Sequence, residues 1–423
     1  MNEELMKKMV VGLLLSSALA FPVVAEDWPR FRGLQAAGVS GETGLLKTWP
    51  EEGPRKLWRR PLGEGFSSIV VVGEQLYTLF ADGDTELAAA FRVTDGEELW
   101  RYPLGAKYVD QWGNGPRATP AVAGGIVYVL ASHGHLAALR TSDGKPVWEL
   151  KIQERFGPPK RSKFSAMEAE GLGDGPFFGY CGSPLLVDDL LIVYTGAGNG
   201  QSLVALDRKT GETVWAALDH AIADSSPIAL ETHGEPQIVV GAPSELLGLS
   251  LNGKVLWRQP WTFTPVALPV FIPPDKLFVS APNDVGGLLM ELHRKENKWE
   301  VKELWKAKWM RNTWQSSIAY NNSIIGFDNA TLKSLDYEGN LQWAKRGLGK
   351  GTLIAADGLL FVLSDRGTLI LAEASTQAFH EKGRVQVLGS PSWTSPALAG
   401  GKLFLRDHQE IVALDVSQQK AED

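Results

Sequence analysis

The sequence predicts an all-β protein, an eight-bladed β-propeller of four-stranded antiparallel blades that is closed by an N-terminal strand completing the last blade. Three repeating features predict it: a tryptophan, a glycine turn and a small-residue opening. The tryptophans recur at intervals of 42, 48, 67, 42, 48 and 38 residues, on short apolar stretches, at Trp58, Trp100, Trp148, Trp215, Trp257, Trp305 and Trp343. A period of 40 to 50 residues built from strand-like segments is typical of a radial array of blades. We expect these seven side chains to dock each blade onto its neighbour.

The glycine turn lies directly before the tryptophan strand. Glycine stands four residues before the tryptophan at Gly96, Gly144, Gly211, Gly253 and Gly339, often after Asp or Asn. Asp-Gly and Asn-Gly favour the positive φ values of a tight hairpin, so the third and fourth strands of each blade should pair antiparallel. Alternating segments such as IVYVLAS and LLIVYTG favour strands over helices.

Each repeat opens with a variable residue, a small residue, usually a hydroxyl residue, and then Pro or an aliphatic residue. The pattern occurs eight times, and small residues suit the crowded innermost strand. Aligning the openings places one variable residue from each at an equivalent position around the axis: Phe66, Arg117, Cys181, Asp224, Val266, Gln315, Lys350 and Trp393.

The two ends of the repeat region predict how the ring closes. Trp58 arrives on a lone strand before any complete blade, and the last repeat supplies three inner strands before the repeats end near residue 416. Pairing the two ends would remove the exposed sheet edges that invite aggregation. The seventh repeat has no tryptophan, so a seven-bladed ring stays open as an alternative.

The chain divides into four parts. Lys7 and Lys8 precede an apolar run at residues 9–24 that ends in Val-Val-Ala, which indicates a signal peptide over residues 1–25. A membrane anchor would need about 20 apolar residues, and no cysteine near Ala25 could accept a lipid. Residues 26–54 form an N-terminal extended segment, 55–416 the propeller and 417–423 a polar tail. We expect a periplasmic or secreted monomer without a membrane span.

Composition excludes several classes of function. The net charge of −7 is spread along the chain, which argues against nucleic acid as a partner because phosphate binding needs a concentrated basic surface. Cys181 is the only cysteine, so no internal disulfide can form. The acidic turn at residues 82–86 and the His133/His135 pair lack the further ligands of a metal site, so no metal is expected.

The chain resembles the quinoprotein-like propellers, also called PQQ-binding-like β-propeller repeat proteins. The resemblance rests on residues 205–215 (ALDRKTGETVW), with weaker copies ending at four other tryptophans, and on residues 114–120 (NGPRATP) and 28–33 (WPRFRG). It covers roughly residues 54–416 and is similar in turn to the BamB family of outer-membrane assembly propellers. A shared fold does not imply a shared site.

The resemblance also sets the enzymatic alternative. Quinoprotein dehydrogenases hold pyrroloquinoline quinone (PQQ) against a disulfide between adjacent cysteines, beside a calcium ion and a catalytic Asp. Cys181 alone cannot make that disulfide, and the sequence shows no matching calcium ligands. We therefore expect no cofactor, no PQQ and no catalytic residue.

The mixed ring of variable positions is the candidate ligand site. A purely structural ring should repeat one residue type, whereas this one mixes cations, an anion, an amide and aromatics. Convergent polar and aromatic groups at a funnel mouth are the usual form of a binding site. The candidates are Phe66, Arg117, Asp224, Gln315, Lys350 and Trp393. The alternative is that Arg117 and Asp224 only satisfy each other or backbone carbonyls.

Tryptophans outside the docking positions lie in or beside the connections between blades, which all emerge on one face. These loop-face aromatics are Trp112, Trp261 and Trp314, together with Trp309 and Trp393. They are candidates for recognition or for packing over the channel mouth. An insertion at residues 153–180 is expected as a long loop on the same face, of functional or merely mobile character.

The sequence thus favours an exported binding or scaffold module for a protein or peptide partner on the loop face, as the BamB resemblance implies. A PQQ-dependent oxidoreductase and a carbohydrate-binding propeller are the alternatives.

Overall fold

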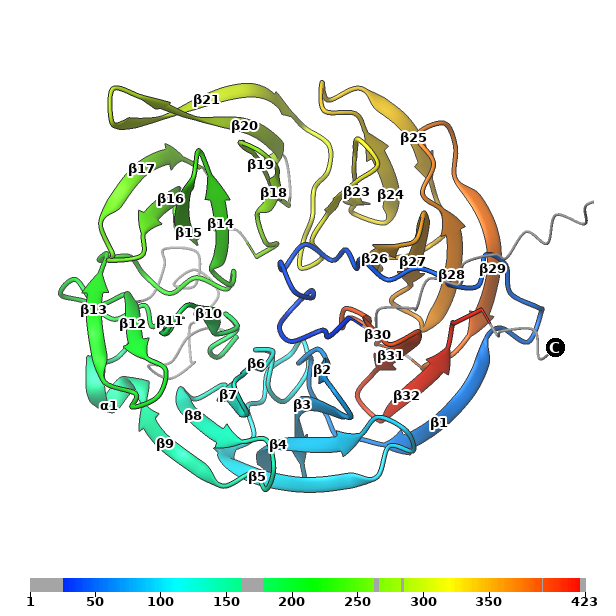
Figure 1. The fold of residues 1–423 in the computed structure, drawn as a ribbon, viewed down its shortest axis with the longest axis horizontal. Helices are drawn as coiled ribbons and strands as arrows, with labels where there is room; N and C mark the ends of the chain where they lie inside the picture. The colour runs from blue at the N-terminus through cyan, green and yellow to red at the C-terminus, as the bar shows by residue number, and fades with distance from the viewer. Residues whose placement is uncertain (1–25, 161–177, 262–265, 283–284, 390, 419–423) are drawn as a thin grey trace, which may run out of the picture.

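The computed structural model describes residues 26–160, 178–261, 266–282, 285–389 and 391–418. These residues form eight four-stranded antiparallel sheets arranged as a ring (Figure 1). The eight-bladed propeller predicted from the sequence is confirmed. The seventh repeat builds a regular blade although it has no tryptophan, so the seven-bladed alternative is wrong.

The first four blades follow one another along the chain. Blade 1 contains β2 (Val70–Val72), β3 (Gln75–Asp82), β4 (Thr85–Arg92) and β5 (Glu98–Ala106). Blade 2 contains β6 (Ala121–Ala123), β7 (Ile126–Leu130), β8 (His135–Arg140) and β9 (Pro146–Lys151). Blade 3 contains β10 (Leu185–Val187), β11 (Leu190–Tyr194), β12 (Leu203–Asp207) and β13 (Thr213–Ala217). Blade 4 contains β14 (Ile228–Thr232), β15 (Glu235–Ala242), β16 (Glu245–Ser250) and β17 (Val255–Pro260).

The remaining blades complete the ring. Blade 5 contains β18 (Val270–Ile272), β19 (Lys276–Ala281), β20 (Gly286–Lys295) and β21 (Lys298–Ala307). Blade 6 contains β22 (Ile318–Tyr320), β23 (Ser323–Asp328), β24 (Thr331–Leu335) and β25 (Leu341–Lys345). Blade 7 contains β26 (Thr352–Ala356), β27 (Leu359–Leu363), β28 (Thr368–Glu373) and β29 (His380–Gln386). Blade 8 contains β30 (Ala397–Ala399), β31 (Lys402–Arg406), β32 (Glu410–Asp415) and β1 (Arg55–Pro61).

Blade 8 closes the ring by joining the two ends of the propeller. β1 pairs antiparallel with β32, from Arg55 opposite Asp415 to Pro61 opposite Glu410. The predicted closing strand is therefore confirmed. Arg406 of β31 strengthens the junction. The residue is 1% exposed, and its guanidinium donates to carbonyl oxygens before and within blade 1, among them those of Gly63, Gly65 and Leu79 at 3.0, 3.1 and 2.6 Å.

The repeated tryptophans dock blade onto blade. Trp58, Trp100 and Trp148 donate their indole N–H to carbonyls of the following blade, at Val93, Thr141 and Arg208, over 2.8, 2.8 and 3.0 Å. Trp215, Trp305 and Trp343 do the same. Trp257 differs, because its indole donates to Gln237 within its own blade at 2.7 Å.

The glycine turns are the surfaces on which these indoles rest. Gly96, for example, has a φ of +70°, and a Cβ added to it would lie 2.6 Å from the Trp58 ring. The predicted turn glycines thus serve two purposes, a positive φ and a close approach of the neighbouring blade's indole.

The N-terminal segment lies across one end of the ring. Residues 26–44 run through the middle of the ring in Figure 1, in blue, and no regular strand is present in this part of the described chain. Hydrogen bonds join the segment to six blades, at Val71, Val122, Leu186, Ser316, Ala355 and Gly400. Most of these residues lie where an innermost strand meets its second strand. We call this side of the ring the hairpin end and the side with the blade-to-blade connections the loop end.

Several expected segments lie partly or wholly outside the described residues. The predicted signal peptide (1–25) and most of the polar tail (419–423) are among them, as are residues 161–177 of the insertion. The described start of the insertion is not loop, because Ile152–Phe156 forms the short helix α1. Ile152 and Phe156 are buried in the core shared with blade 3, which explains the helix that the sequence alone did not indicate.

Candidate functional site

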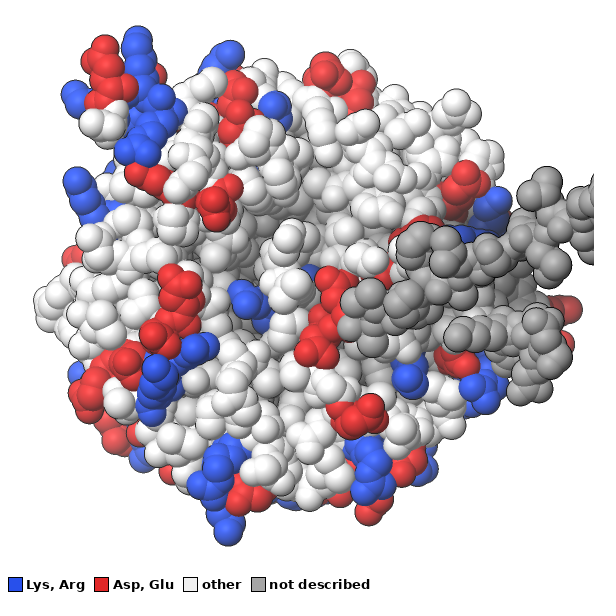
Figure 2. All heavy atoms as spheres, viewed as in Figure 1, with Lys and Arg blue, Asp and Glu red and all other residues white. Residues whose placement is uncertain are grey.

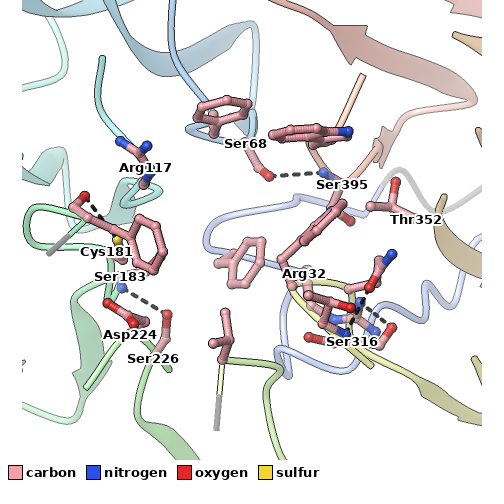
Figure 3. A pocket seen from close by; sticks show the side chains of 18 of the residues that line it. Arg32, Ser68, Arg117, Cys181, Ser183, Asp224, Ser226, Ser316, Thr352 and Ser395 are labelled. Atoms are coloured by element: carbon pink, nitrogen blue, oxygen red, sulfur yellow. Dashed lines mark hydrogen bonds between the residues drawn. The ribbon is translucent and has the colours of Figure 1, made fainter. Parts of the chain in front are cut away.

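A cavity of about 310 Å³ lies on the axis of the ring, between the blade openings. Seven of the eight predicted ring positions line it, as listed here: Phe66, Arg117, Cys181, Asp224, Val266, Gln315 and Trp393. Figure 3 shows Arg117, Cys181 and Asp224 on one side of the cavity. Lys350 is not among the lining residues; its Nζ lies 5.2 Å from the centroid of the Trp314 ring, and Trp314 lines the cavity.

Arg117 is held in place by an ion pair and by aromatic faces. Its Nη2 lies 2.6 Å from Asp110 Oδ2, and both side chains are largely buried. The guanidinium also donates to the carbonyls of Gly113 and Gly115 at 2.9 and 3.1 Å. Its carbon lies 5.2 Å from the Phe66 ring centroid, within cation–π range. Arg117 does not form an ion pair with Asp224, so the alternative in which these two side chains satisfy each other is wrong. Arg117 does donate to backbone carbonyls, as the other form of that alternative expected.

Aromatic rings extend from Arg117 along one side of the cavity. The rings of Phe66 and Trp393 are stacked at 5.3 Å, and the rings of Trp393 and Trp314 are tilted at 4.9 Å. We call Phe66, Trp393 and Trp314 the aromatic arc. A cation lies over each end of the arc: the Arg117 guanidinium over Phe66 and the Lys350 ammonium over Trp314.

The other side of the cavity carries a carboxyl group and a thiol. Asp224 is partly exposed and lines the cavity. Burial raises the pKa of Asp224 to about 6, although Arg117 and the nearby Cys181 thiol lower it. Burial also raises the pKa of the Cys181 thiol well above its ordinary value, with the negative charge of Asp224 acting in the same direction. Cys181 is therefore a neutral thiol, without the thiolate character that reactive cysteines need.

The floor of the cavity comes from residues that the sequence did not single out as site residues. Phe31 and Arg32 of the N-terminal segment line the cavity. Arg32 is 3% exposed and donates to the carbonyls of Ser316 and Ser317 at 3.1 and 2.7 Å. Because the segment crosses the hairpin end, the cavity has a floor on that side. Residues 28–33 (WPRFRG) contribute to the family resemblance, but nothing local in this run indicates a path through the ring.

His408 and Asp110 are further residues that sequence reasoning missed. The His408 ring lies 4.3 Å from the Phe66 ring in an edge arrangement. Burial, with the charge of Arg406 as a smaller contribution, lowers the pKa of His408 to about 4, so the imidazole is neutral near pH 7. Asp110 lies in the connection between β5 and β6, and His408 lies in the turn between β31 and β32; neither belongs to the blade openings from which the site was predicted.

The hydroxyl residues of the openings link the blades. The amides of Ser68, Thr119 and Ser183 each donate to the equivalent hydroxyl of the next blade, at 3.0, 2.9 and 2.8 Å. The Ser395 amide donates to Ser68 Oγ at 3.2 Å, which carries the chain of bonds across the closure (Figure 3). Leu268 interrupts the pattern in blade 5. This hydroxyl girdle is structural, and the sequence had suggested only that small residues belong there.

The predicted loop aromatics differ in how far they are exposed. Trp112 and Trp309 are 52% and 41% exposed, and Trp112 also lines the cavity. Trp314 is half-buried in the aromatic arc. Trp261 is 2% exposed and packs in the core of blades 4 and 5, so of the two roles considered for it the structure favours packing over recognition. Lys306 of blade 5 lies over its ring, 5.6 Å from the centroid.

The molecular surface has no single sign of charge on the face that Figure 2 shows. Lys and Arg side chains alternate there with Asp and Glu around the rim of the disc. In the described part of the chain, no group of three or more His, Cys, Asp or Glu side chains is placed to hold a metal ion. No helix among the described residues is both long and apolar enough to cross a bilayer.

The fold and the axial site together define an eight-bladed propeller of the quinoprotein-like class. The family model described as "Outer membrane protein assembly factor BamB" matches residues 42–165 and 87–303. The chain therefore belongs to the BamB family.

Known proteins resemble the chain over part of its length. It is 26% identical over 223 residues to the outer membrane protein assembly factor BamB of Shewanella oneidensis, covering 52% of this chain and 50% of that protein. It is 30% identical over 129 residues to BamB of Salmonella typhimurium, covering 27% of this chain and 32% of that protein. The chain thus spans at most about half the length of these curated relatives.

Solved structures support the fold. The crystal structure of BamB from Moraxella catarrhalis has a TM-score of 0.54 at 13% identity and covers 86% of this chain and 99% of that one. Quinohemoprotein alcohol dehydrogenase from Comamonas testosteroni has a TM-score of 0.63 at 12% identity and covers 94% of this chain and 81% of that one. At these identities the likeness concerns the propeller and not the site.

Proposed function

We propose that this protein is a binding module of the periplasm or cell exterior that captures a protein segment or peptide at the loop end of the propeller. Membership of the BamB family supports a role of this kind, since relatives carry the name of an assembly factor. The axial cavity would receive one part of the bound segment, and the rim would contact the rest.

The observation that carries this proposal is the exposed apolar rim of the cavity. Val109 and Trp112, on the connection between β5 and β6, are 64% and 52% exposed, and Trp112 lines the cavity as well. Solvent-exposed apolar side chains beside a concave site are typical of interaction surfaces, and tryptophan is enriched among the residues that dominate binding energy. A peptide lying over Trp112 would bury this side chain and place a side chain of its own in the cavity.

We further propose that the cavity does not hold PQQ, whose several carboxylates need a basic site. The Asp224 carboxyl on its wall would repel them. Arg117 is already paired with Asp110, and the chain has only one cysteine. The residues therefore do not fit this cofactor.

Peptide selection tests the proposal. A phage-displayed random heptapeptide library is panned on the wild-type protein, and the dissociation constant of each enriched peptide is measured by fluorescence anisotropy. Trp112→Ala should weaken binding at least tenfold. Val214→Ala is the matched control, because Val214 is 54% exposed on the outer strand β13, away from the cavity.

The other functions are outcomes of the same test. Failure to enrich any peptide, or equal loss in both variants, would overturn the peptide proposal. Binding of an oligosaccharide panel in place of peptides would favour the carbohydrate alternative. Dye-linked alcohol oxidation after addition of PQQ and Ca²⁺ would favour the oxidoreductase.

A further inference from the structure

Asp224 is a carboxyl group on the wall of the axial cavity. Among the described residues no Lys, Arg or His nitrogen forms a salt bridge with it, although it lines the axial cavity. We propose that the cavity binds an organic cation, a primary or methylated amine such as a lysine side chain, with its ammonium group on Asp224. This deepens the proposed function, because it identifies the group of the bound segment that enters the cavity.

The nearest positive charge is already committed elsewhere. Arg117 forms a 2.6 Å ion pair with Asp110 and donates to two carbonyl oxygens. The Cys181 thiol, within hydrogen-bonding reach of Asp224, also lies 3.3 Å from the Phe178 carbonyl, and a thiol is a weak donor. A carboxylate removed from water without a strong partner is unfavourable. An ammonium ion supplied by a ligand would remove that penalty.

The walls of the cavity suit the rest of such a ligand. Phe31, Phe66 and Trp393 line it, and aromatic faces attract ammonium groups while they also pack against methylene chains. The Arg117 guanidinium, within 6 Å of the Phe66, Tyr108 and Phe178 centroids, shows that aromatic faces already surround a cation here.

The size of the cavity sets a limit. A volume of about 310 Å³ is at the small end of ligand pockets. It accommodates one long side chain or a small amine. The rest of a longer ligand must extend out of the cavity at the loop end, because Phe31 and Arg32 form its floor.

Ionisation of Asp224 gives a specific pH dependence. The charged or titratable groups near it are Arg117, Cys181, Asp110 and Tyr108. With a pKa of about 6, Asp224 is roughly one-tenth ionised at pH 5 and nine-tenths ionised at pH 7. A lysine amine stays protonated over this range. Its affinity should therefore rise about tenfold from pH 5 to pH 7.

Titration with defined amines tests the inference. The probes are Nα-acetyl-lysine methylamide, its Nζ-trimethyl form and the uncharged Nα-acetyl-norleucine methylamide, in phosphate buffer free of Tris. Tryptophan fluorescence and calorimetry report binding. The two amines should bind at least tenfold more tightly than the norleucine compound. Asp224→Asn should abolish that preference, and Asp224→Glu should retain part of it.

The matched control is Asp219→Asn. Asp219 lies on the same connection but pairs with Lys160 at 2.6 Å on the surface, so its replacement should leave amine affinity unchanged. Thermal denaturation of each variant confirms that it is folded. Equal binding of the norleucine compound, full affinity in Asp224→Asn, or affinity that falls from pH 5 to pH 7 would overturn the inference.

Failure of this inference is distinguishable from failure of the proposed function. Selected peptides that depend on Trp112 but not on Asp224 would refute only the amine site. Amine binding without any peptide binding would refute only the peptide proposal.

Discussion

Replacing Asp224 with asparagine should make the protein more stable at neutral pH. Burial raises the pKa of Asp224 from 3.8 to about 6, so between these values the native state binds a proton more tightly than the unfolded state. The free energy of unfolding therefore falls as pH rises through this window. The penalty is absent below about pH 4 and complete above about pH 7. Asparagine has nearly the same shape and does not titrate, so Asp224→Asn should remove the penalty.

The magnitude follows from the shift. About two pKa units correspond to about 3 kcal/mol at 1.36 kcal/mol per unit. Solvent reaching Asp224 through the cavity screens the charge, so we expect about 1–3 kcal/mol at pH 7.5. Unfolding entropy of about 2.1 cal/mol/K per residue converts this to an increase in Tm of about 1–4 °C.

The assay is urea or thermal denaturation of wild type and variant at pH 4 to 8. The two should differ little near pH 4, diverge between pH 4 and pH 6, and keep a constant difference above about pH 7. Asp219→Asn is the control with the opposite sign, because the Lys160 hydrogen bond lowers the pKa of Asp219 and its carboxylate therefore stabilises the fold at neutral pH. A variant less stable than wild type at pH 7.5, or a difference independent of pH, would refute the reasoning.

Three further predictions concern the ring. Trp58→Ala should cost about 3–5 kcal/mol of stability by denaturant unfolding, and the more exposed Trp148 should cost less when truncated; equal and negligible effects would contradict blade docking. A chain beginning at Gly63 should aggregate in light scattering because it lacks β1, whereas one beginning at Arg55 retains β1 and should remain a folded ring; equal behaviour would show that β1 is not the closing strand. Arg406→Leu leaves several buried carbonyls unsatisfied and should lower the free energy of unfolding by at least about 3 kcal/mol, with Arg406→Lys intermediate. An unchanged denaturation midpoint would mean that the Arg406 hydrogen bonds do not stabilise the ring closure.

The fold was predictable because its determinants are local and repeated. The turn glycine, the indole four residues later and the small-residue opening recur within each blade, so each copy confirms the others. Blade 7 shows the redundancy, since it forms without a tryptophan. Aligning the openings also brought seven ring positions to one cavity, because equivalent positions in a ring lie around its axis.

What could not be predicted depends on contacts distant in the sequence. Arg32 reaches Ser316 and Ser317, nearly 300 residues away, and no local pattern indicates that path. Asp110 is recognisable as the Arg117 partner only once the connection is folded. Trp261 has the sequence context of a loop aromatic, yet the neighbouring hairpin of blade 5 buries it.

Within the four residues of a blade opening, one position contributes to the structure of the ring and another lines the candidate binding site. In blades 1 to 4 its third residue supplies a hydroxyl that accepts a hydrogen bond from an amide of the preceding blade and so joins neighbouring inner strands. The first residue, two positions earlier, lines the axial cavity in seven of the eight blades, and Arg117, Asp224 and Trp393 give it different chemistry. Because these hydroxyls join the blades beside the residues that line the cavity, the lining can change its chemistry while the contacts between inner strands stay the same. The placement of the Asp224 carboxyl opposite the aromatic arc is then a property of this chain's site and not of the propeller fold.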